Sequence, residues 1–163
     1  MRELDMQTKV DSALRYVLKY YPSDGHELTK TRLTKLIYLL DWESALKTGR
    51  QVTDINWYFN HYGPFVSDVF DAADDDSELR IVEKVSNFGT KKYVVEAKHG
   101  LESLTYDLTF DEEVLINKII EETKYKSWND FIDYVYATYP IRETEKYGFL
   151  DLVKLAEESK KQV

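Results

Sequence analysis

The side chains that most often carry out catalysis are few in this sequence and are poorly spaced for it. The histidines are His26, His61 and His99, and the chain contains no cysteine. Zinc sites need such ligands in close pairs, so a metal site is not expected. The 6 glycines are scattered, and neither common glycine-rich phosphate-binding motif can be written from them. The sequence therefore predicts no cofactor and no metal.

Carboxylate and hydroxyl side chains do not form an active-site pattern either. Asp41 and Glu43 are two positions apart on an expected helix, so they project in different directions and are not a general acid–base pair. The acidic run at residues 74–76 lacks the glycine and the final glutamate of a calcium-binding loop, which favours a solvated loop. Ser44 and Ser67 show no accompanying base. We predict a protein with no enzymatic activity and no catalytic residues.

The most distinctive chemistry is a run of aromatic residues over positions 57–65, WYFNHYGPF. Tyrosine and tryptophan offer a large contact area with few rotatable bonds, which is why they dominate protein-binding hot spots. Strand alternation predicts that Trp57 and Phe59 face the core, and that the next residue in each case faces outward. The predicted partner-binding surface consists of Tyr58, Asn60, His61, Tyr62, Gly63, Pro64 and Phe65.

Simpler interpretations of this surface stay open. His61 fits the polar end of a strand better than a catalytic base. Gly63 serves the turn, because the chain must reverse direction there. Exposed tyrosines such as Tyr58 also occur on surfaces without a function, and a strand whose rings only fill the core would show the same pattern.

A helix before the aromatic run is expected to support it. Its apolar residues recur at steps of three and four, as on one buried face: Leu33, Leu36, Ile37 and Leu40. Thr29 or Thr31 is the expected N-cap, and Gly49 is the expected stop. Near the end of this helix, Asp41 is expected to bond Arg50 or a backbone N–H of the next loop, or else to lie exposed.

The start of the same helix carries a small basic cluster of Lys30, Arg32 and Lys35. In a chain of net charge −8 such a cluster is usually a solvated face, and local contact with DNA is the alternative. After the aromatic strand, Pro64 is expected to open another helix, because a first helical turn needs no N–H donor from it. A loop is expected at residues 74–78.

Further helices are expected along the rest of the chain. Capping residues mark helix starts at Thr8, Thr109 and Ser127. The last of these helices places Trp128 on its apolar side, together with Phe131, Ile132, Val135 and Tyr139. Pro140 is expected to end that helix, and Phe149 is expected on the apolar face of a final one.

A β-hairpin is expected between the helices. Residues 79–86 and 91–98 alternate in hydrophobicity, and a connection containing Gly89 joins them. We expect the hairpin to form a three-stranded sheet with the aromatic strand. The fold class predicted is therefore α+β: a mainly helical single domain over residues 1–163 with a small antiparallel sheet made of the aromatic strand and the β-hairpin.

Three sequence features resemble the Panacea domain, which occurs in SocA-like and GepA-like proteins of bacteria and their phages. They are the helical segment KLIYLLDWE, the pair Gly49-Arg50 and a strand that ends in HYGPF. The resemblance is close over residues 28–70 and covers only the order of elements elsewhere. It implies an antitoxin that neutralises a cognate protein toxin, encoded beside it, by direct binding. Many toxins paired with the family resemble small alarmone synthetases, which implies a partner that acts on translation.

Composition predicts a globular protein of the cytoplasm. The 163 residues are 43% hydrophobic and suffice for one domain with a core. The chain has no cysteine, no apolar leader and no segment that could span a membrane. Its net charge of −8 argues against specific nucleic-acid binding and suits a basic protein partner, with simple solubility as the alternative.

Two other functions stay open at this point. One is a proteolytic adaptor that delivers a partner to a protease. The other is a phage or prophage transcriptional regulator that uses the hairpin as a wing, although the acidic residues 74–78 beside the hairpin weigh against it. The domain is expected to begin within the first residues, which leaves no room for an added DNA-binding segment. Nothing in the sequence indicates an oligomeric state.

Overall fold

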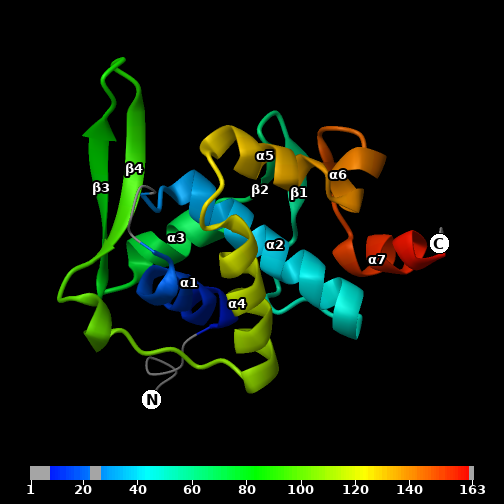
Figure 1. The fold of residues 1–163 in the computed structure, drawn as a ribbon, viewed down its shortest axis with the longest axis horizontal. Coiled ribbons are helices and arrows are strands. Elements are labelled where there is room, and N and C mark those ends of the chain that lie inside the picture. The colour runs from blue at the N-terminus through cyan, green and yellow to red at the C-terminus, as the bar shows by residue number, and fades with distance from the viewer. Residues whose placement is uncertain (1–7, 23–26, 162–163) are drawn as a thin grey trace.

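The computed structural model describes residues 8–22 and 27–161, and they form the mainly helical α+β fold that was predicted (Figure 1). The helices are α1 (Lys9–Tyr20), α2 (Lys30–Thr48), α3 (Asp68–Asp75), α4 (Phe110–Thr123), α5 (Trp128–Tyr136), α6 (Tyr139–Glu143) and α7 (Leu152–Lys160), with a 3-10 turn η2 (Leu101–Ser103). The strands are β1 (Tyr58–Asn60), β2 (Gly63–Phe65), β3 (Leu79–Val85), β4 (Lys91–Ala97) and β5 (Gly148–Phe149).

Helix α2 is the centre of the fold, and nearly all of its sides are buried. The Thr29 hydroxyl caps its start by accepting from the Arg32 N–H, and Gly49 ends it with a left-handed φ of 78°. Helices α1, α3, α4 and α7 all pack on it (Figure 1). The apolar face expected from sequence is therefore only part of its buried surface, which also includes Tyr38, Leu39, Trp42 and Ala45.

The strands form two separate sheets, which corrects the prediction that the aromatic strand and the hairpin share one. In the first sheet β1 lies between β2 and β5, with both pairings antiparallel. In the second, β3 and β4 pair with each other over their whole length. The hairpin projects from one end of the elongated molecule, far from β1, whereas α7 occupies the other end (Figure 1). The place expected for the hairpin beside β1 is taken by the two-residue strand β5.

Pro64 lies in strand β2 and does not open a helix, because α3 begins only at Asp68. Strand β2 is an edge of its sheet, where a residue without an N–H is tolerated. The predicted loop at residues 74–78 is also partly wrong, because α3 runs to Asp75. Asp76 then leaves the helix, and its carboxylate receives two hydrogen bonds from the Arg15 guanidinium at 2.8 and 2.7 Å.

Two expectations for the C-terminal third are wrong. Helix α5 ends at Tyr136, and Pro140 stands in the first turn of the short helix α6. Proline suits that place because its missing N–H would have no intrahelical partner there. Phe149 belongs to β5 and is 74% exposed, so it is not part of the apolar face of α7, which begins at Leu152.

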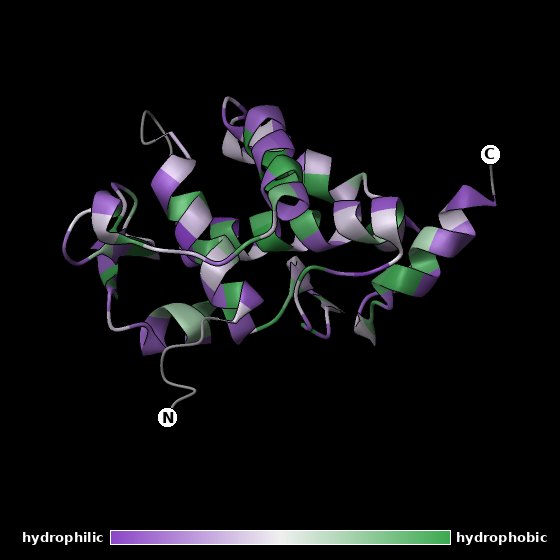
Figure 2. Ribbon diagram, turned by 90° about the horizontal axis from the view of Figure 1, so that it is seen from below, coloured by the Kyte–Doolittle hydropathy of each residue, from purple (hydrophilic) through white to green (hydrophobic). Residues whose placement is uncertain are grey.

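Features set by neighbouring residues agree with the sequence predictions. The hydroxyls of Thr8, Thr109 and Ser127 cap α1, α4 and α5, and Glu112 completes the box at Thr109. The hairpin has the predicted strands, and Gly89 takes a φ of 82° in its turn. Apolar and polar stretches alternate along most helices (Figure 2), as expected when one side lies in the core. Across the described residues, no helix combines the length and the apolar character needed to cross a bilayer.

The basic cluster at the start of α2 is not a solvated face: Lys30 is half-buried, with its Nζ 4.4 Å from the centre of the Phe70 ring, and the other two residues are buried. Arg32 is buried, and its guanidinium lies 4.4 Å from the centre of the Phe131 ring. Lys35 is buried as well, with 2% of its surface exposed. Both cations therefore belong to the interior of the molecule, and the expectation of a solvated face is wrong.

Candidate partner-binding site

A buried aspartate ties the aromatic strand to α2. The Asp41 carboxylate is fully buried and accepts five hydrogen bonds. The backbone N–H groups of Val52 and Thr53 donate at 3.0 and 2.9 Å, and Trp57 Nε1 donates at 2.9 Å. The Thr53 hydroxyl and the Gln51 amide supply the other two. The loop N–H expected as one partner of this carboxylate is thus confirmed.

The protonation of Asp41 reflects two opposing effects. Burial raises the pKa of its carboxyl group to about 6, whereas hydrogen bonds from Thr53, Trp57 and Val52 act to lower it. At neutral pH the group is mainly ionised, which suits an acceptor that serves five donors. The network holds the loop after α2, and with it β1, at a fixed position on the central helix.

The aromatic strand alternates as predicted. Trp57 and Phe59 are buried in the core, while Tyr58 and Asn60 on the opposite face are half-buried. The rest of the predicted surface divides into two groups, the exposed His61, Tyr62 and Phe65 and the buried Gly63 and Pro64. The exposed side chains are thus the accessible part of the predicted surface, while the buried pair shapes the backbone beneath them.

The turn between β1 and β2 is fixed from several sides. Asn60 Oδ1 accepts from the Tyr62 N–H at 2.8 Å, and the Tyr62 carbonyl accepts from Lys35 Nζ at 2.8 Å. Gly63 has a φ of 95°, and a Cβ atom there would lie 2.9 Å from Cε1 of Tyr136. Only glycine avoids both the backbone strain and the clash. The exposed rings of this turn therefore stand on a rigid base.

A pocket of about 350 Å³ opens beside the turn. We call it the aromatic pocket; it is lined by Thr31, Lys35, Tyr62, Phe65, Trp128, Ile132 and Tyr136. Its walls come from α2, the β1–β2 segment and α5, so the pocket exists only in the folded chain. Tyr62, Trp128 and Phe65 are 68%, 44% and 43% exposed, respectively, and form its accessible apolar surface.

Sequence reasoning found only Tyr62 and Phe65 among the pocket residues. Lys35 was assigned to a solvated face, and Trp128 to the apolar side of its helix. The buried face of α5 is in fact completed by Phe131 and Val135, which leaves Trp128 at the surface. The sequence did contain a signal, which is the width of the apolar stripe on α5. This nine-residue helix has more large apolar residues than one buried face can hold, so at least one of them must lie at the surface.

Lys35 is the one lysine that the structure describes as buried. Burial alone lowers the pKa of its ammonium group to about 8, because no carboxylate of the described residues pairs with it. The aromatic pocket therefore combines apolar walls with a positive charge that the fold does not neutralise.

A second aromatic pair lies next to the turn. The rings of Tyr58 and Phe149 meet edge to face, with centroids 5.2 Å apart. Phe149 comes from β5, which pairs with β1, and its exposure was missed in the sequence because strand β5 has only two residues. Tyr147, the residue just before β5, takes a φ of 69°, which is unusual for a residue with a side chain. This pair extends the exposed aromatic surface along β1.

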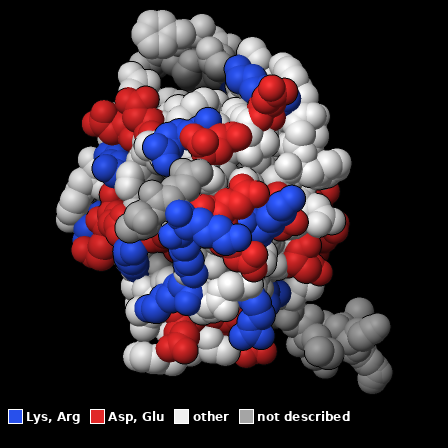
Figure 3. Space-filling model, turned by 90° about the vertical axis from the view of Figure 1, so that its right-hand side faces the viewer, with Lys and Arg blue, Asp and Glu red and all other residues white. Residues whose placement is uncertain are grey.

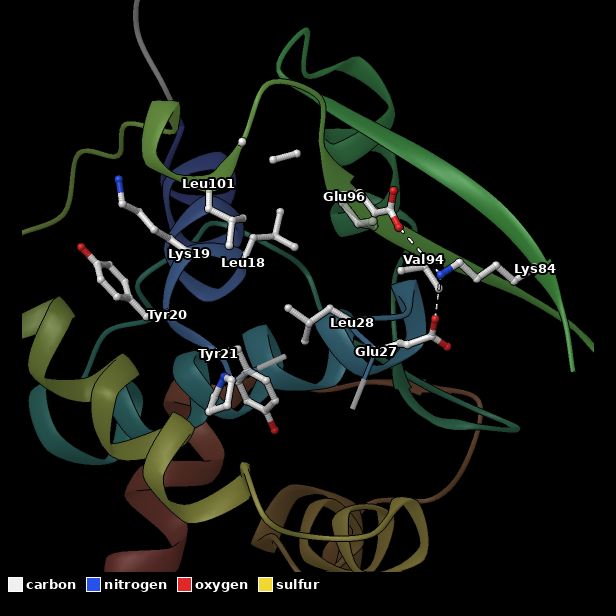
Figure 4. Close-up of a pocket in the computed structure, with 14 residues that line it drawn as sticks. Leu18, Lys19, Tyr20, Tyr21, Glu27, Leu28, Lys84, Val94, Glu96 and Leu101 are labelled. Atoms are coloured by element: carbon white, nitrogen blue, oxygen red, sulfur yellow. Dashed lines mark hydrogen bonds and ion pairs between the residues drawn. The ribbon is translucent and has the colours of Figure 1, made fainter. Parts of the chain in front are cut away.

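A larger cavity, of about 640 Å³, lies elsewhere, between the end of α1, η2 and the hairpin (Figure 4). Its apolar lining includes Leu18, Leu28 and Leu101. Its charged groups already have partners, since Lys84 Nζ lies 2.8 Å from a Glu27 oxygen and 3.8 Å from a Glu96 oxygen. Lys19 Nζ donates to the Leu104 carbonyl at 2.9 Å. Because that cavity is both distant from the aromatic turn and internally neutralised, it is the weaker candidate for recognition.

Charges elsewhere are mixed. On the face that carries α7 and the end of α2, acidic and basic side chains are interspersed (Figure 3). Over residues 8–22 and 27–161, no group of three or more histidine, cysteine or acidic side chains is arranged to hold a metal ion. His26, one of the three histidines considered as a ligand, lies outside the described residues.

Comparison with known proteins identifies the relatives of this chain. Residues 33–140 match the family model described as antitoxin SocA-like, Panacea domain. The matched region runs from the first buried leucine of α2, through the aromatic turn, to the start of α6, and so contains all of the aromatic pocket except Thr31. No curated protein and no solved structure matches the chain. Since the family match covers most of its length, the chain belongs to the antitoxin SocA-like, Panacea domain family.

Proposed function

We propose that this protein is a non-enzymatic antitoxin that neutralises a cognate toxin by binding it directly. The family supplies the antitoxin role in general terms. The observation that supports direct binding is the surface around the β1–β2 turn, where Tyr62, Phe65 and Trp128 are exposed around a pocket. Large exposed rings beside a concave site are typical of the centre of a protein–protein interface.

The rigidity of this surface strengthens the proposal. Binding is opposed by the entropy lost when mobile side chains and loops become ordered. Here Lys35 and Asn60 fix the turn through hydrogen bonds, and Asp41 fixes the strand beneath it. A surface that is already ordered loses little further conformational entropy on binding, so a modest contact area can give a stable complex.

The regulator alternative is less well supported. A wing that contacts DNA needs cations free to neutralise phosphates. In the hairpin, Arg80 pairs with Glu96 at 3.3 Å, Lys84 pairs with Glu27 at 2.8 Å, and Lys92 also pairs with Glu27. These bridges neutralise much of the positive charge of the hairpin, which leaves it poorly suited to a phosphate backbone.

Tyr62→Ala and Phe65→Ala are expected to abolish rescue from the toxin while leaving the thermal midpoint nearly unchanged. Each ring is exposed, so its loss removes contact area from the partner without opening a cavity in the core. The measurement is growth on co-expression with the neighbouring gene whose product alone is toxic. Each variant should weaken the complex by about 2 kcal/mol or more, or roughly 30-fold in Kd.

Two matched controls accompany this experiment. Tyr125→Ala and Phe110→Ala remove rings that are exposed even more fully, on other parts of the surface, and should retain rescue. Leu36→Ala removes a buried side chain and should lower stability by about 2–5 kcal/mol. If the Tyr62 and Phe65 variants unfold like the Leu36 variant, the site is wrong. If purified protein leaves the toxin active unless a protease is added, the adaptor function replaces direct neutralisation.

Association with a basic toxin is expected to slow as salt concentration rises. The chain has a net charge of −8, and opposite net charges raise the rate of encounter. Between about 0.05 and 0.5 M salt the Debye length falls from over 10 Å to roughly 4 Å, so the association rate constant should fall while the dissociation rate constant changes little. Surface plasmon resonance measures both. A salt-independent association rate would assign the acidity to solubility alone.

A further inference from the structure

The aromatic pocket contains a cation that the fold leaves without a counter-ion. Lys35 is 2% exposed, and its Nζ donates one hydrogen bond, to the neutral carbonyl of Tyr62 at 2.8 Å. An ammonium group has three N–H donors. The described residues offer it no ion pair, although Lys35 itself lines the pocket.

Two other cations that lie inside or partly inside the fold have more partners than Lys35: Arg15 is half-buried, and Arg32 is buried. Arg15 forms two hydrogen bonds with the carboxylate of Asp76. Arg32 donates to three oxygens and stacks over the Phe131 ring. Burying a charge without a partner is costly, and the lowered pKa of the Lys35 ammonium reflects that cost. A buried lysine that has one neutral acceptor and lines an open pocket is therefore well suited to receive a negative group.

We propose that the aromatic pocket binds an aspartate or glutamate side chain of the partner toxin, whose carboxylate pairs with Lys35 Nζ and whose apolar neighbour packs against Phe65 and Trp128. This inference rests on the proposed function and names the chemistry of its contact. The hydroxyl-bearing residues Thr31, Tyr62 and Tyr136 line the same pocket and can bond the second carboxylate oxygen.

The pocket favours an acidic side chain over the free carboxylate at a chain end. A chain end carries backbone N–H and C=O groups with it, and these need partners when they are buried. Phe65 and Ile132 supply no hydrogen-bonding side chain, and the few polar groups of the wall are already needed to pair with one carboxylate. An aspartate or glutamate side chain brings only its carboxylate below the surface, so it suits a pocket that holds a single cation.

A local acidic contact is compatible with a partner that is basic overall. The net charges act at long range and raise the rate of encounter, whereas a buried ion pair acts only in the final, oriented complex. An acidic residue facing Lys35 would thus fix the register of the complex. It would also discriminate among basic partners, because one that lacks the carboxylate would leave the ammonium buried and unpaired.

The test uses the full chain and three peptides, followed by backbone amide NMR shifts of the residues that line the pocket. The first peptide, N-acetyl-Ala-Phe-Glu-Leu-Ala-amide, should bind at least tenfold more tightly than its Glu→Gln counterpart. The third, N-acetyl-Ala-Phe-Leu-Ala with a free carboxyl end, should bind no better than the Gln peptide. Lys35→Met should remove the preference for Glu, and Lys47→Met, on the exposed end of the same helix, should keep it.

A purely structural role for Lys35 predicts a different result. In that case Lys35→Met would lower the Tm and leave the ratio of Glu to Gln peptide affinities unchanged, whereas we expect the Tm to be maintained and the ratio to fall to one. Equal binding of the first two peptides, a preference for the free chain end, or a Kd weaker than about 5 mM for the Glu peptide overturns the inference. If any of these results is obtained and Tyr62→Ala still loses toxin rescue, the carboxylate inference is wrong but the proposed antitoxin function is retained.

Discussion

Replacing Asp41 with alanine is expected to destabilise the fold by about 3–5 kcal/mol. The carboxylate is the shared acceptor for the loop of Val52 and Thr53, for Gln51 and for the indole of Trp57. Without it, donors that are buried away from water lose their partner at once, and each unsatisfied donor costs free energy. Urea unfolding followed by circular dichroism measures the loss.

Asp54→Ala is the matched control, because Asp54 is an exposed aspartate in the loop that Asp41 holds; its effect should stay within about 0.5 kcal/mol. Asp41→Asn should fall between the two, since the amide retains one acceptor oxygen but turns an NH₂ group toward other donors. A loss below about 1 kcal/mol for Asp41→Ala would show that water or a shifted loop replaces the carboxylate. The strand would then depend on its ring packing alone.

The stability of the protein is expected to rise by roughly 2 kcal/mol between about pH 7 and pH 9.5 because of Lys35. Its folded-state pKa is lowered from 10.5 to about 8 by burial. Below pH 8 both states hold the proton, so the folded state carries the full cost of a buried charge. Between the two pKa values the unfolded chain binds more protons, so the free energy of unfolding increases with pH.

The comparison that isolates this effect is wild type against Lys35→Met. The variant is expected to be at least as stable as wild type at pH 7 and to lack the rise attributed to Lys35. Tyrosines with raised pKa values, among them Tyr136 in the same pocket, oppose the rise only above about pH 10 and are common to both proteins. Parallel stability curves for the two proteins would mean that Lys35 keeps its ordinary pKa, reached by water at the pocket mouth.

Local signals in the sequence predicted the local structure well. The cap at Thr109 with Glu112, the hairpin turn at Gly89 and the alternation of Trp57 with Phe59 all depend on residues close together in the chain. Each is decided by hydrogen bonds or side-chain direction within a few residues, so the pattern carries the information. The position of the aromatic turn was predictable for the same reason.

The features that the sequence pattern did not predict depend on packing between segments that are far apart in the chain. Lys35 looks solvated beside Lys30 and Arg32, but the β1–β2 turn and α5 pack around it in the folded chain. Phe149 looks like part of a helix, and only pairing with β1 makes it a strand residue. Burial of a cation and pairing of a two-residue strand leave no periodic trace, because both depend on segments far away in the chain.

The position of β5 beside β1 determines when this sheet can be completed during synthesis of the chain. Tyr58 pairs with Phe149, so the sheet joins positions about ninety residues apart. A chain made at about 5–20 residues per second emerges over roughly 5–18 seconds between those two points. Until then β1 has only β2 beside it, and Tyr58 has no ring at its edge. A nascent chain therefore keeps β1 paired on one side only until residue 149 has been made, and the edge-to-face pair of Tyr58 and Phe149 is among the last contacts of this sheet to form.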